Sequence, residues 1–254
     1  MLIILMFIIG TIFGSFYNVV GYRIPKEESI IYPSSHCPKC NHKLHFYELI
    51  PILSFIIQKG KCTKCKEKIS PFYPIFELIT GILFTLSLMI YDLNPSLLIV
   101  LTFISMLIII TISDIKYMII PDNILIIFTV LLITEIYYIQ GLNTVISSIK
   151  EGLISFIIMF TIKKVGDFIF KKESMGGGDI KLMFLIGMIL SYKNALLTIF
   201  LGSLIGLPIS LITIKNNSTH ILPFGPLLAS AATIIILSQI NLDIIINIIQ
   251  LRII

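Results

Sequence analysis

The stretch Met175-Gly176-Gly177-Gly178-Asp179-Ile180-Lys181 places a carboxylate directly after three glycines and directly before an apolar run over residues 182–190. A carboxylate at the start of a membrane helix is costly, so such residues usually line a cavity and take part in function. Glycines carry no side chain and let another chain approach the backbone closely. A flexible loop with an N-cap aspartate is the plain alternative, because both residue types suit a helix start.

The composition around this stretch is that of a polytopic membrane protein. The chain has 254 residues, of which 56% are hydrophobic and 13% charged, and its mean hydropathy is +1.00. A soluble domain is about a quarter charged. The net charge of +5 is therefore no sign of nucleic-acid binding, because basic residues in such a chain mainly set its topology. Residues 1–20 lack the basic region and the cleavage site of a signal peptide, which indicates a retained helix.

We expect an all-α protein with about eight transmembrane helices, several of them near the minimum length that a bilayer requires. The tail 241–254 could extend the last helix or lie on the outer surface. The expected spans are residues 2–21, 72–91, 97–113, 123–139, 145–162, 180–191, 195–214 and 226–240.

Basic residues predict how these spans are oriented. Nine of the nineteen lie in the polar segment 23–71, whereas Lys150, Lys193 and Arg252 alone fall near the opposite side. The positive-inside rule therefore predicts a multi-pass protein of the cell membrane whose N-terminus is outside and whose polar segment is cytoplasmic. We expect three parts: a first helix over residues 1–22, a cytoplasmic zinc-binding domain over 23–71 and a helical core over 72–254.

The polar segment has the pattern of a zinc site. It contains Cys37-Pro38-Lys39-Cys40 and Cys62-Thr63-Lys64-Cys65, two C-x-x-C pairs separated by 21 residues. Two such pairs supply the four thiolates of a tetrahedral site, in which zinc has a structural role. A redox function needs one C-x-x-C pair rather than two. His36, His42 and His45 lie near enough in the sequence to be substitute ligands.

A second aspartate of the same kind is Asp114, at the end of the span 97–113. Under the predicted topology, Asp114 and Asp179 lie at the same cytoplasmic face. Two carboxylates in one site cannot both ionise cheaply, so one keeps a proton and the pair offers an acid and a base. Asp122 follows Pro121 and is expected to cap the next helix. Such a pair can activate water for peptide hydrolysis.

Helix dipoles predict how the two aspartates divide these roles. Asp179 opens a span and therefore meets the positive end of its helix, whereas Asp114 closes a span and meets the negative end. We expect Asp179 to hold the charge and Asp114 the proton. Lys181 should add little, because residues two apart on a helix do not face each other.

In these features the chain resembles the type IV prepilin peptidases, a branch of the GxGD aspartyl proteases. The similar segments cover most of the chain in the expected order, although G-x-G-D alone is a weak pattern. They are Gly14–Val20 with Arg23 and Pro25, the double C-x-x-C segment with Tyr47–Ser54, Glu77–Gly81, Asp114 with Ile120–Asp122, Gly176–Lys181 and Pro223–Pro226.

The resemblance implies a bifunctional membrane enzyme. It would cleave the basic leader of prepilin or pseudopilin substrates after a glycine, with Asp114 and Asp179 as catalytic residues and Gly176 and Gly178 in the loop that the substrate approaches. It would then methylate the new N-terminus with S-adenosylmethionine. No nucleotide-binding glycine pattern marks the methyl-donor site; Glu48 is a candidate for a polar contact there, and pairing with a lysine of the same segment is the alternative.

Three other interpretations stay open at this point. A peptidase of the same family could lack methylation. A zinc-containing membrane scaffold would explain the spans and the cysteines, but it would not need carboxylates on two helices at one face. A proton-coupled carrier would need such carboxylates, but carriers usually place them near the bilayer midplane between paired repeats. Both aspartates here lie at helix ends.

Overall fold

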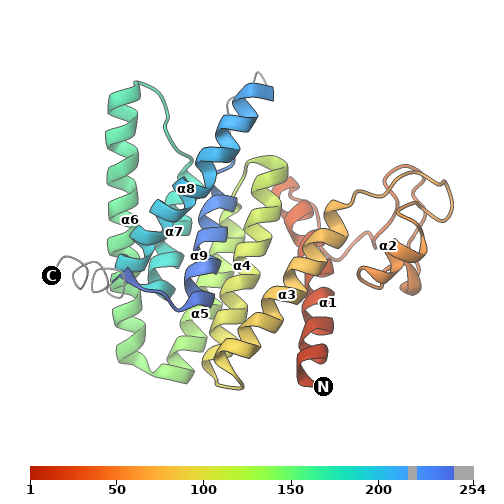
Figure 1. Ribbon diagram of the computed structural model, residues 1–254, viewed down its shortest axis with the longest axis horizontal. Coiled ribbons are helices and arrows are strands. Elements are labelled where there is room, and N and C mark those ends of the chain that lie inside the picture. The colour runs from red at the N-terminus through yellow and green to blue at the C-terminus, as the bar shows by residue number, and fades with distance from the viewer. Residues whose placement is uncertain (217–221, 243–254) are drawn as a thin grey trace. The chain divides into compact units, whose positions relative to one another are not determined.

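The computed structural model describes residues 1–216 and 222–242, which are helical apart from loops and two isolated β-bridges (Figure 1). The chain divides into two compact units, Met1–Leu97 and Leu98–Ile254. The span at 72–91 groups with the first helix and the polar segment in the first unit, and not with the helices that follow it.

The first unit is built on two helices that pack closely through small residues. They are α1 (Leu2–Arg23) and α3 (Phe72–Tyr91). A Cβ atom added to Gly10 would lie 2.8 Å from the Cα of Gly81, and one added to Gly14 would lie 2.8 Å from the Cα of Glu77. Gly10 and Gly14 form a G-x-x-x-G pattern, which lets the backbones of membrane helices come into contact.

Between these helices, the polar segment forms three short elements and two cysteine turns. The elements are η1 (Ile24–Lys26), η2 (Phe46–Glu48) and α2 (Leu53–Ile57). Glu77 of α3 accepts a hydrogen bond of 2.7 Å from the backbone N–H of Ile52, whose φ of 62° is unusual for a β-branched residue. A carboxylate of the span thus fixes the turn that precedes α2.

The second unit is a bundle of six helices in the described part of the chain (Figure 1). Its most buried helix is α4, in which Phe103, Ile104, Met106 and Ile110 are completely inaccessible. The short helix α7 is also central, because it contacts α5, α6, α8 and α9. The bounds are α4 Ser96–Tyr117, α5 Asp122–Gln140, α6 Leu142–Phe170, α7 Gly177–Leu190, α8 Tyr192–Asn216 and α9 Gly225–Ser238.

Two contacts with α6 fix α7, one at its middle and one just after its end. A Cβ atom on Gly152 of α6 would lie 2.7 Å from the carbonyl oxygen of Phe184, so α6 and α7 approach without intervening side chains. Glu151 of α6 accepts a hydrogen bond of 2.8 Å from the N–H of Tyr192, at the turn between α7 and α8. This half-buried carboxylate satisfies an otherwise unpaired N–H at the start of a helix.

Each predicted apolar run forms a helix in the described residues, but only six helices are long and apolar enough to cross a membrane. The expected number of eight spans is therefore too high by this measure. Helices α7 and α9 have 14 residues each, or about 21 Å of length, against the roughly 30 Å of a bilayer core. Most of the tail 241–254 lies outside the described residues.

Candidate active site

Asp114 is buried in the last turn of α4 and is held by the start of α9. The N–H of Gly225, the first residue of α9, donates a hydrogen bond of 3.0 Å to Asp114 Oδ2. The preceding residue, Ser113, donates a hydrogen bond of 2.6 Å to the carbonyl of Ile119 in the connector between α4 and α5. Asp114 therefore has a fixed position between two helices.

Asp179 is buried at the third position of α7. Its carboxylate reaches back to the backbone of Gly176, the N-cap residue, and accepts a hydrogen bond from it. This is the arrangement of an acidic side chain in a capping box. The other oxygen, Oδ1, is buried without a hydrogen-bond partner among the described residues. An orphaned buried oxygen of this kind is a marker of function, because it is left free for a water molecule or a shared proton.

The structure brings the two aspartates together, close enough for their charges to interact. Ile120 contributes to this closeness, because it packs against both glycines that neighbour the carboxylates. A Cβ atom on Gly178 would lie 2.8 Å from Ile120 Cβ, and one on Gly225 would lie 2.7 Å from Asp114 Oδ2. Neither position has room for a side chain. By contrast, a Cβ atom on Gly177 would meet nothing within 4 Å.

An ion pair beside the aspartates joins α5 to α7. Lys181 Nζ lies 2.7 Å from both Oδ1 and Oδ2 of Asp122. Pro121 occupies the N-cap position of α5 and Asp122 is the first residue of the helix, so the expected N-cap role of Asp122 is wrong. The sequence did not indicate this contact of Lys181, because the partner of Lys181 lies on another helix and not on its own.

The arrangement of Asp114 and Asp179 is suited to acid–base chemistry on a water molecule. Each carboxylate accepts one backbone N–H, which leaves further oxygen positions for a water and a proton. Two neighbouring carboxylates share a proton, so that one acts as base and the other as acid. Among the predicted site residues, Gly176 and Gly178 both lie within this cluster.

The four cysteines of the first unit converge on one point. Cys37 Sγ lies 3.8 Å from Cys65 Sγ, and Cys40 Sγ lies 4.0 Å from Cys62 Sγ, with all four sulfurs within 4.8 Å of one another. Zinc–sulfur bonds of about 2.3 Å in a tetrahedron place sulfurs about 3.8 Å apart. The donor set and its spacing therefore fit a zinc ion with no open coordination position.

Backbone groups prepare two thiols of this cluster, one in each cysteine turn, for a cation. N–H groups of Cys40 and Lys39 point at the sulfur of Cys37 and lower the pKa of that thiol to about 7. N–H groups of Cys65 and Lys64 lower the pKa of the Cys62 thiol in the same way. Thiolates are the species that bind metal. The histidines group separately, since His42 and His45 lie beside Glu48.

Glu48 is buried, and both of its carboxylate oxygens accept hydrogen bonds from other residues of the first unit. Its Oε2 accepts hydrogen bonds from the N–H of His45, at 2.8 Å, and from His42 Nε2, at 3.2 Å, while Oε1 accepts one from Thr63 Oγ1. Burial would raise the pKa of Glu48, but these hydrogen bonds outweigh it and hold the pKa below its usual range. Glu48 thus connects the two cysteine turns, and its partner is His42 rather than a lysine.

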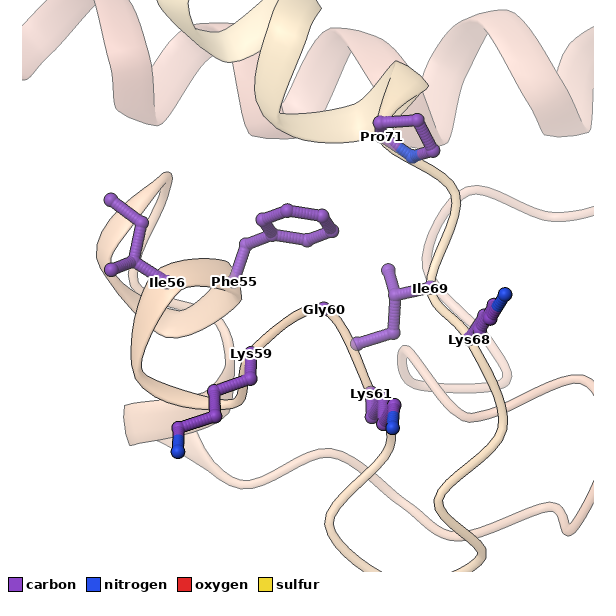
Figure 2. Close-up of a pocket in the computed structure, with 8 residues that line it drawn as sticks. All are labelled: Phe55, Ile56, Lys59, Gly60, Lys61, Lys68, Ile69 and Pro71. Carbon is purple, nitrogen blue, oxygen red and sulfur yellow. The ribbon is translucent and has the colours of Figure 1, made fainter.

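A pocket of about 360 Å³ lies beside the cysteine turns (Figure 2). Its wall is apolar and comes from α2 and from the residues just before α3. Three lysines line it as well, so a sulfonium compound such as S-adenosylmethionine would meet repulsion there. The lining residues are Phe55, Ile56, Lys59, Gly60, Lys61, Lys68, Ile69 and Pro71.

Comparison with known families gives two matches that together cover most of the chain. The bacterial peptidase A24 N-terminal domain matches residues 8–91, and the type IV leader peptidase family matches residues 101–211. The first range lies in the first compact unit and the second range lies in the second unit. The two aspartates fall within the second match.

Several characterised proteins are similar over most of their length. A prepilin leader peptidase/N-methyltransferase of Bacillus subtilis is 37% identical over 231 residues, which are 90% of this chain and 91% of that protein. Its counterpart of Vibrio cholerae is 34% identical over 215 residues, 80% of this chain and 83% of that protein. The type 4 prepilin-like proteins leader peptide-processing enzyme of Escherichia coli is 28% identical over 240 residues, 87% of this chain and 88% of that protein. No solved structure matches the chain.

Proposed function

The chain belongs to the type IV leader peptidase family, and from this premise we propose that it cleaves the leader peptide from prepilin-like proteins and methylates the N-terminus that cleavage exposes. The observation that carries the proposal is the pair of buried carboxylates, Asp114 and Asp179, at the ends of two helices of one unit. A zinc scaffold has no use for such a pair, and a proton-coupled carrier would place it near the bilayer midplane between paired repeats rather than at helix ends.

Cleavage follows from the pair of carboxylates. The charged carboxylate removes a proton from a water molecule as the water oxygen attacks the scissile carbonyl carbon. The protonated carboxyl group donates a hydrogen bond to the carbonyl oxygen, where negative charge develops. When the tetrahedral intermediate collapses, the C–N bond breaks and the leaving amine takes the proton that came from water. The free Oδ1 of Asp179 and the second oxygen of Asp114 are the positions that face this chemistry.

Two features of this geometry oppose the division of roles predicted from helix dipoles. Asp114 lies at the negative end of α4, but it also accepts the N–H of Gly225 at the positive end of α9. Asp179 has a buried oxygen without a partner, and a buried carboxylate oxygen that lacks hydrogen bonds favours the neutral form. We therefore assign the charge to Asp114 and the proton to Asp179 in the resting enzyme.

The substrate would reach this site from the cytoplasmic face, with the leader still attached. Gly176 and Gly177 are exposed and leave the backbone at the start of α7 open, whereas Ile120 packs against Gly178, so an extended peptide could approach the aspartates beside Gly176. The proposal includes the predicted orientation: an outside N-terminus, cytoplasmic aspartates and a cytoplasmic zinc unit in the cell membrane. Its partners are prepilin or pseudopilin substrates and membrane lipids.

Methylation requires a methyl donor, and S-adenosylmethionine is the donor that the family name implies. The residues described do not offer a fitting site for it. Glu48, the candidate from the sequence, has both oxygens occupied by Thr63, His42 and His45, and the lysines of the pocket repel a sulfonium. We derive no methyl-transfer step from these residues.

Zinc, by contrast, fits the residues present. Cys37, Cys40, Cys62 and Cys65 would hold it and leave no position for water or substrate. Bound zinc would connect the two cysteine turns, and Glu48 adds a second link through Thr63. Its role is to stabilise the fold of the first unit, and it takes no part in hydrolysis.

A single assay tests the proposal. The purified chain, reconstituted in lipid vesicles, is incubated with a prepilin and with S-adenosylmethionine, and the product is analysed by mass spectrometry and N-terminal sequencing. We expect a product that has lost its leader and gained one methyl group on the new N-terminal amine. Cleavage without the methyl group would identify a peptidase of this family that lacks methylation. An intact prepilin would contradict the proposal.

A further inference from the structure

We infer that the pocket between α2 and the start of α3 binds the headgroup of an anionic phospholipid of the surrounding membrane. The pocket lies in the first unit, away in the sequence from both aspartates, and it takes no part in the cleavage mechanism above. Its lining combines positive charge with an apolar floor, and no residue of the zinc cluster belongs to it. The following observations identify the occupant.

The first observation is unbalanced positive charge. Lys59, Lys61 and Lys68 all line the pocket, and all three are exposed. Within the described residues, none of them forms an ion pair, whereas Lys26, Lys163 and Lys181 do. Their ammonium groups lie at the rim of the hollow, those of Lys59 and Lys68 pointing outward in Figure 2, and the positive charge at this rim attracts an anion and repels cations. This excludes the sulfonium methyl donor and the basic leader of a substrate as occupants.

The second observation is the apolar floor. The ring of Phe55 covers Gly60, whose added Cβ atom would lie 3.1 Å from the ring. Figure 2 shows this ring facing Ile69, with Pro71 on the same side of the hollow. A small soluble anion gains nothing from such a surface, whereas the glycerol and the first methylene groups of a phospholipid do. Lysine stems lie along apolar surface in the same way.

The third observation is the position of the pocket relative to the membrane. Pro71 is the N-cap residue of α3, a helix long and apolar enough to span a bilayer. A pocket that contains the residue before a span lies at the level of the headgroups. Beside it, α2 exposes Ile56 to 62% and Ile57 to 76%, side chains that water does not favour but an interface accepts. Lipid phosphate is therefore the anion within reach.

The test measures lipid binding by the full-length protein. The chain is purified in detergent, stripped of lipid and titrated with phosphatidylglycerol or with phosphatidylcholine of the same acyl chains, and bound lipids are counted by native mass spectrometry. A variant that carries Lys59→Gln, Lys61→Gln and Lys68→Gln is compared with a control that carries Lys39→Gln, Lys43→Gln and Lys66→Gln. Both variants lose the same charge from the same unit, but only the first changes the pocket.

Each lysine near a membrane surface contributes about fivefold in affinity for anionic lipid. We therefore expect the wild type to prefer phosphatidylglycerol at least about tenfold, the pocket variant to lose this preference and the control to keep it. Added salt should weaken the preference, since these lysines are exposed. Water-soluble glycerol phosphate should fail to displace the lipid, because it lacks the apolar part.

Three outcomes would overturn the inference. The pocket variant could keep the preference, the control could lose it equally, or glycerol phosphate could displace the lipid, which would identify a site for a soluble anion. Lys61 precedes Cys62, so the zinc content of each variant is measured as a check on folding. If the triple variant loses zinc, the lipid preference is measured instead on the double variant Lys59→Gln, Lys68→Gln. Its control is the double variant Lys39→Gln, Lys43→Gln.

Discussion

The ammonium group of Lys181 lies 2.7 Å from both carboxylate oxygens of Asp122, and this contact joins the starts of the two helices that flank the candidate catalytic residues. Asp122 follows the connector after α4, the helix whose last turn contains Asp114, and Lys181 lies two residues after Asp179. The contact therefore links the two chain segments that carry the carboxylates. It is a positioning contact and does not touch the reacting atoms.

Loss of this ion pair should weaken cleavage without abolishing it. The two side chains are 52% and 58% exposed, and such pairs contribute about 1 kcal/mol or less. We expect Lys181→Gln and Asp122→Asn each to lower kcat/KM by about fivefold or less, with little change in the unfolding midpoint. Kinetics of the two single variants and the double variant measure this.

The double variant provides the control for the ion pair. If the two residues act through their contact, the double variant should be no slower than either single variant, because the second change removes nothing further. Losses that multiply would show that the residues act independently. A complete loss in either single variant would place that residue among the catalytic groups.

Asp114→Asn and Asp179→Asn should each abolish cleavage. An amide can neither accept a proton from water nor donate one as a carboxyl group does, so a shared-proton mechanism fails at its first step. The amide has nearly the same size, and both variants should therefore fold and bind zinc as the wild type does. Cleavage of a prepilin, followed by electrophoresis and mass spectrometry, measures the effect. Residual cleavage in either variant at a rate near that of the wild type would refute the assignment.

Two adjacent glycines should respond in opposite ways to alanine. Gly178→Ala places a Cβ atom 2.8 Å from Ile120 Cβ, and overpacking of this kind costs about 1–3 kcal/mol. Relief requires the start of α7 to move, and Asp179 moves with it, so we expect cleavage to fall by about tenfold or more. Gly177→Ala meets nothing within 4 Å and should cleave normally, with equal or slightly higher stability. Equal activity of the two variants would contradict the close contact with Ile120.

Metal analysis should find about one zinc ion per chain, as a four-cysteine site requires. Cys37→Ser and Cys62→Ser remove one thiolate from different cysteine turns, and each should release zinc and make residues 23–71 more sensitive to protease. The metal has no open coordination position and therefore takes no part in hydrolysis. Cleavage should be lost only when the first unit unfolds, and not at the moment when zinc is released. A carefully prepared wild type without zinc would end this prediction.

The sequence predicted the helices well because membrane spans depend on one strong property, a long apolar run. It overestimated the number of spans by counting α7 and α9, and it placed their ends only approximately, since a run does not state where a helix begins and ends. Helix α7 starts at Gly177 and stops before Ser191, whose φ of 72° breaks it. The close packing of α1 on α3 was also accessible from the G-x-x-x-G pattern of Gly10 and Gly14, which we did not use.

The candidate site was predictable in its chemistry and not in its contacts. Asp114, Asp179 and the cysteines stand out, because charged groups next to membrane spans and paired C-x-x-C turns are rare by chance. The donation from Gly225 to Asp114 spans 111 residues of chain, and no local pattern contains that information. The same holds for Glu48, whose partners His42 and Thr63 are known only from how the polar segment folds.

The charge distribution between the aspartates provides the last prediction. Helix dipoles alone favour a charged Asp179, but the geometry gives Asp114 the N–H of Gly225 and the positive end of α9. Charge-assisted hydrogen bonds of this kind are about twice as strong as neutral ones. Asp179 Oδ1 is buried without a partner, and protonation removes the cost of an unpaired charge. We therefore expect Asp179 to hold the proton in the dominant microstate of a coupled pair.

Infrared difference spectra in the carboxyl-stretch region, recorded near neutral pH on the two asparagine variants, measure this distribution. The band of a protonated carboxyl group should disappear in Asp179→Asn, where only the charged Asp114 remains, and persist in Asp114→Asn. Gly225→Ala is the matched test of the cause, because its Cβ atom would lie 2.7 Å from Asp114 Oδ2 and would force the N–H donor away. In that variant the proton should shift toward Asp114. A band that persists in Asp179→Asn and disappears in Asp114→Asn would show that the dipole of α4 outweighs the hydrogen bond from α9.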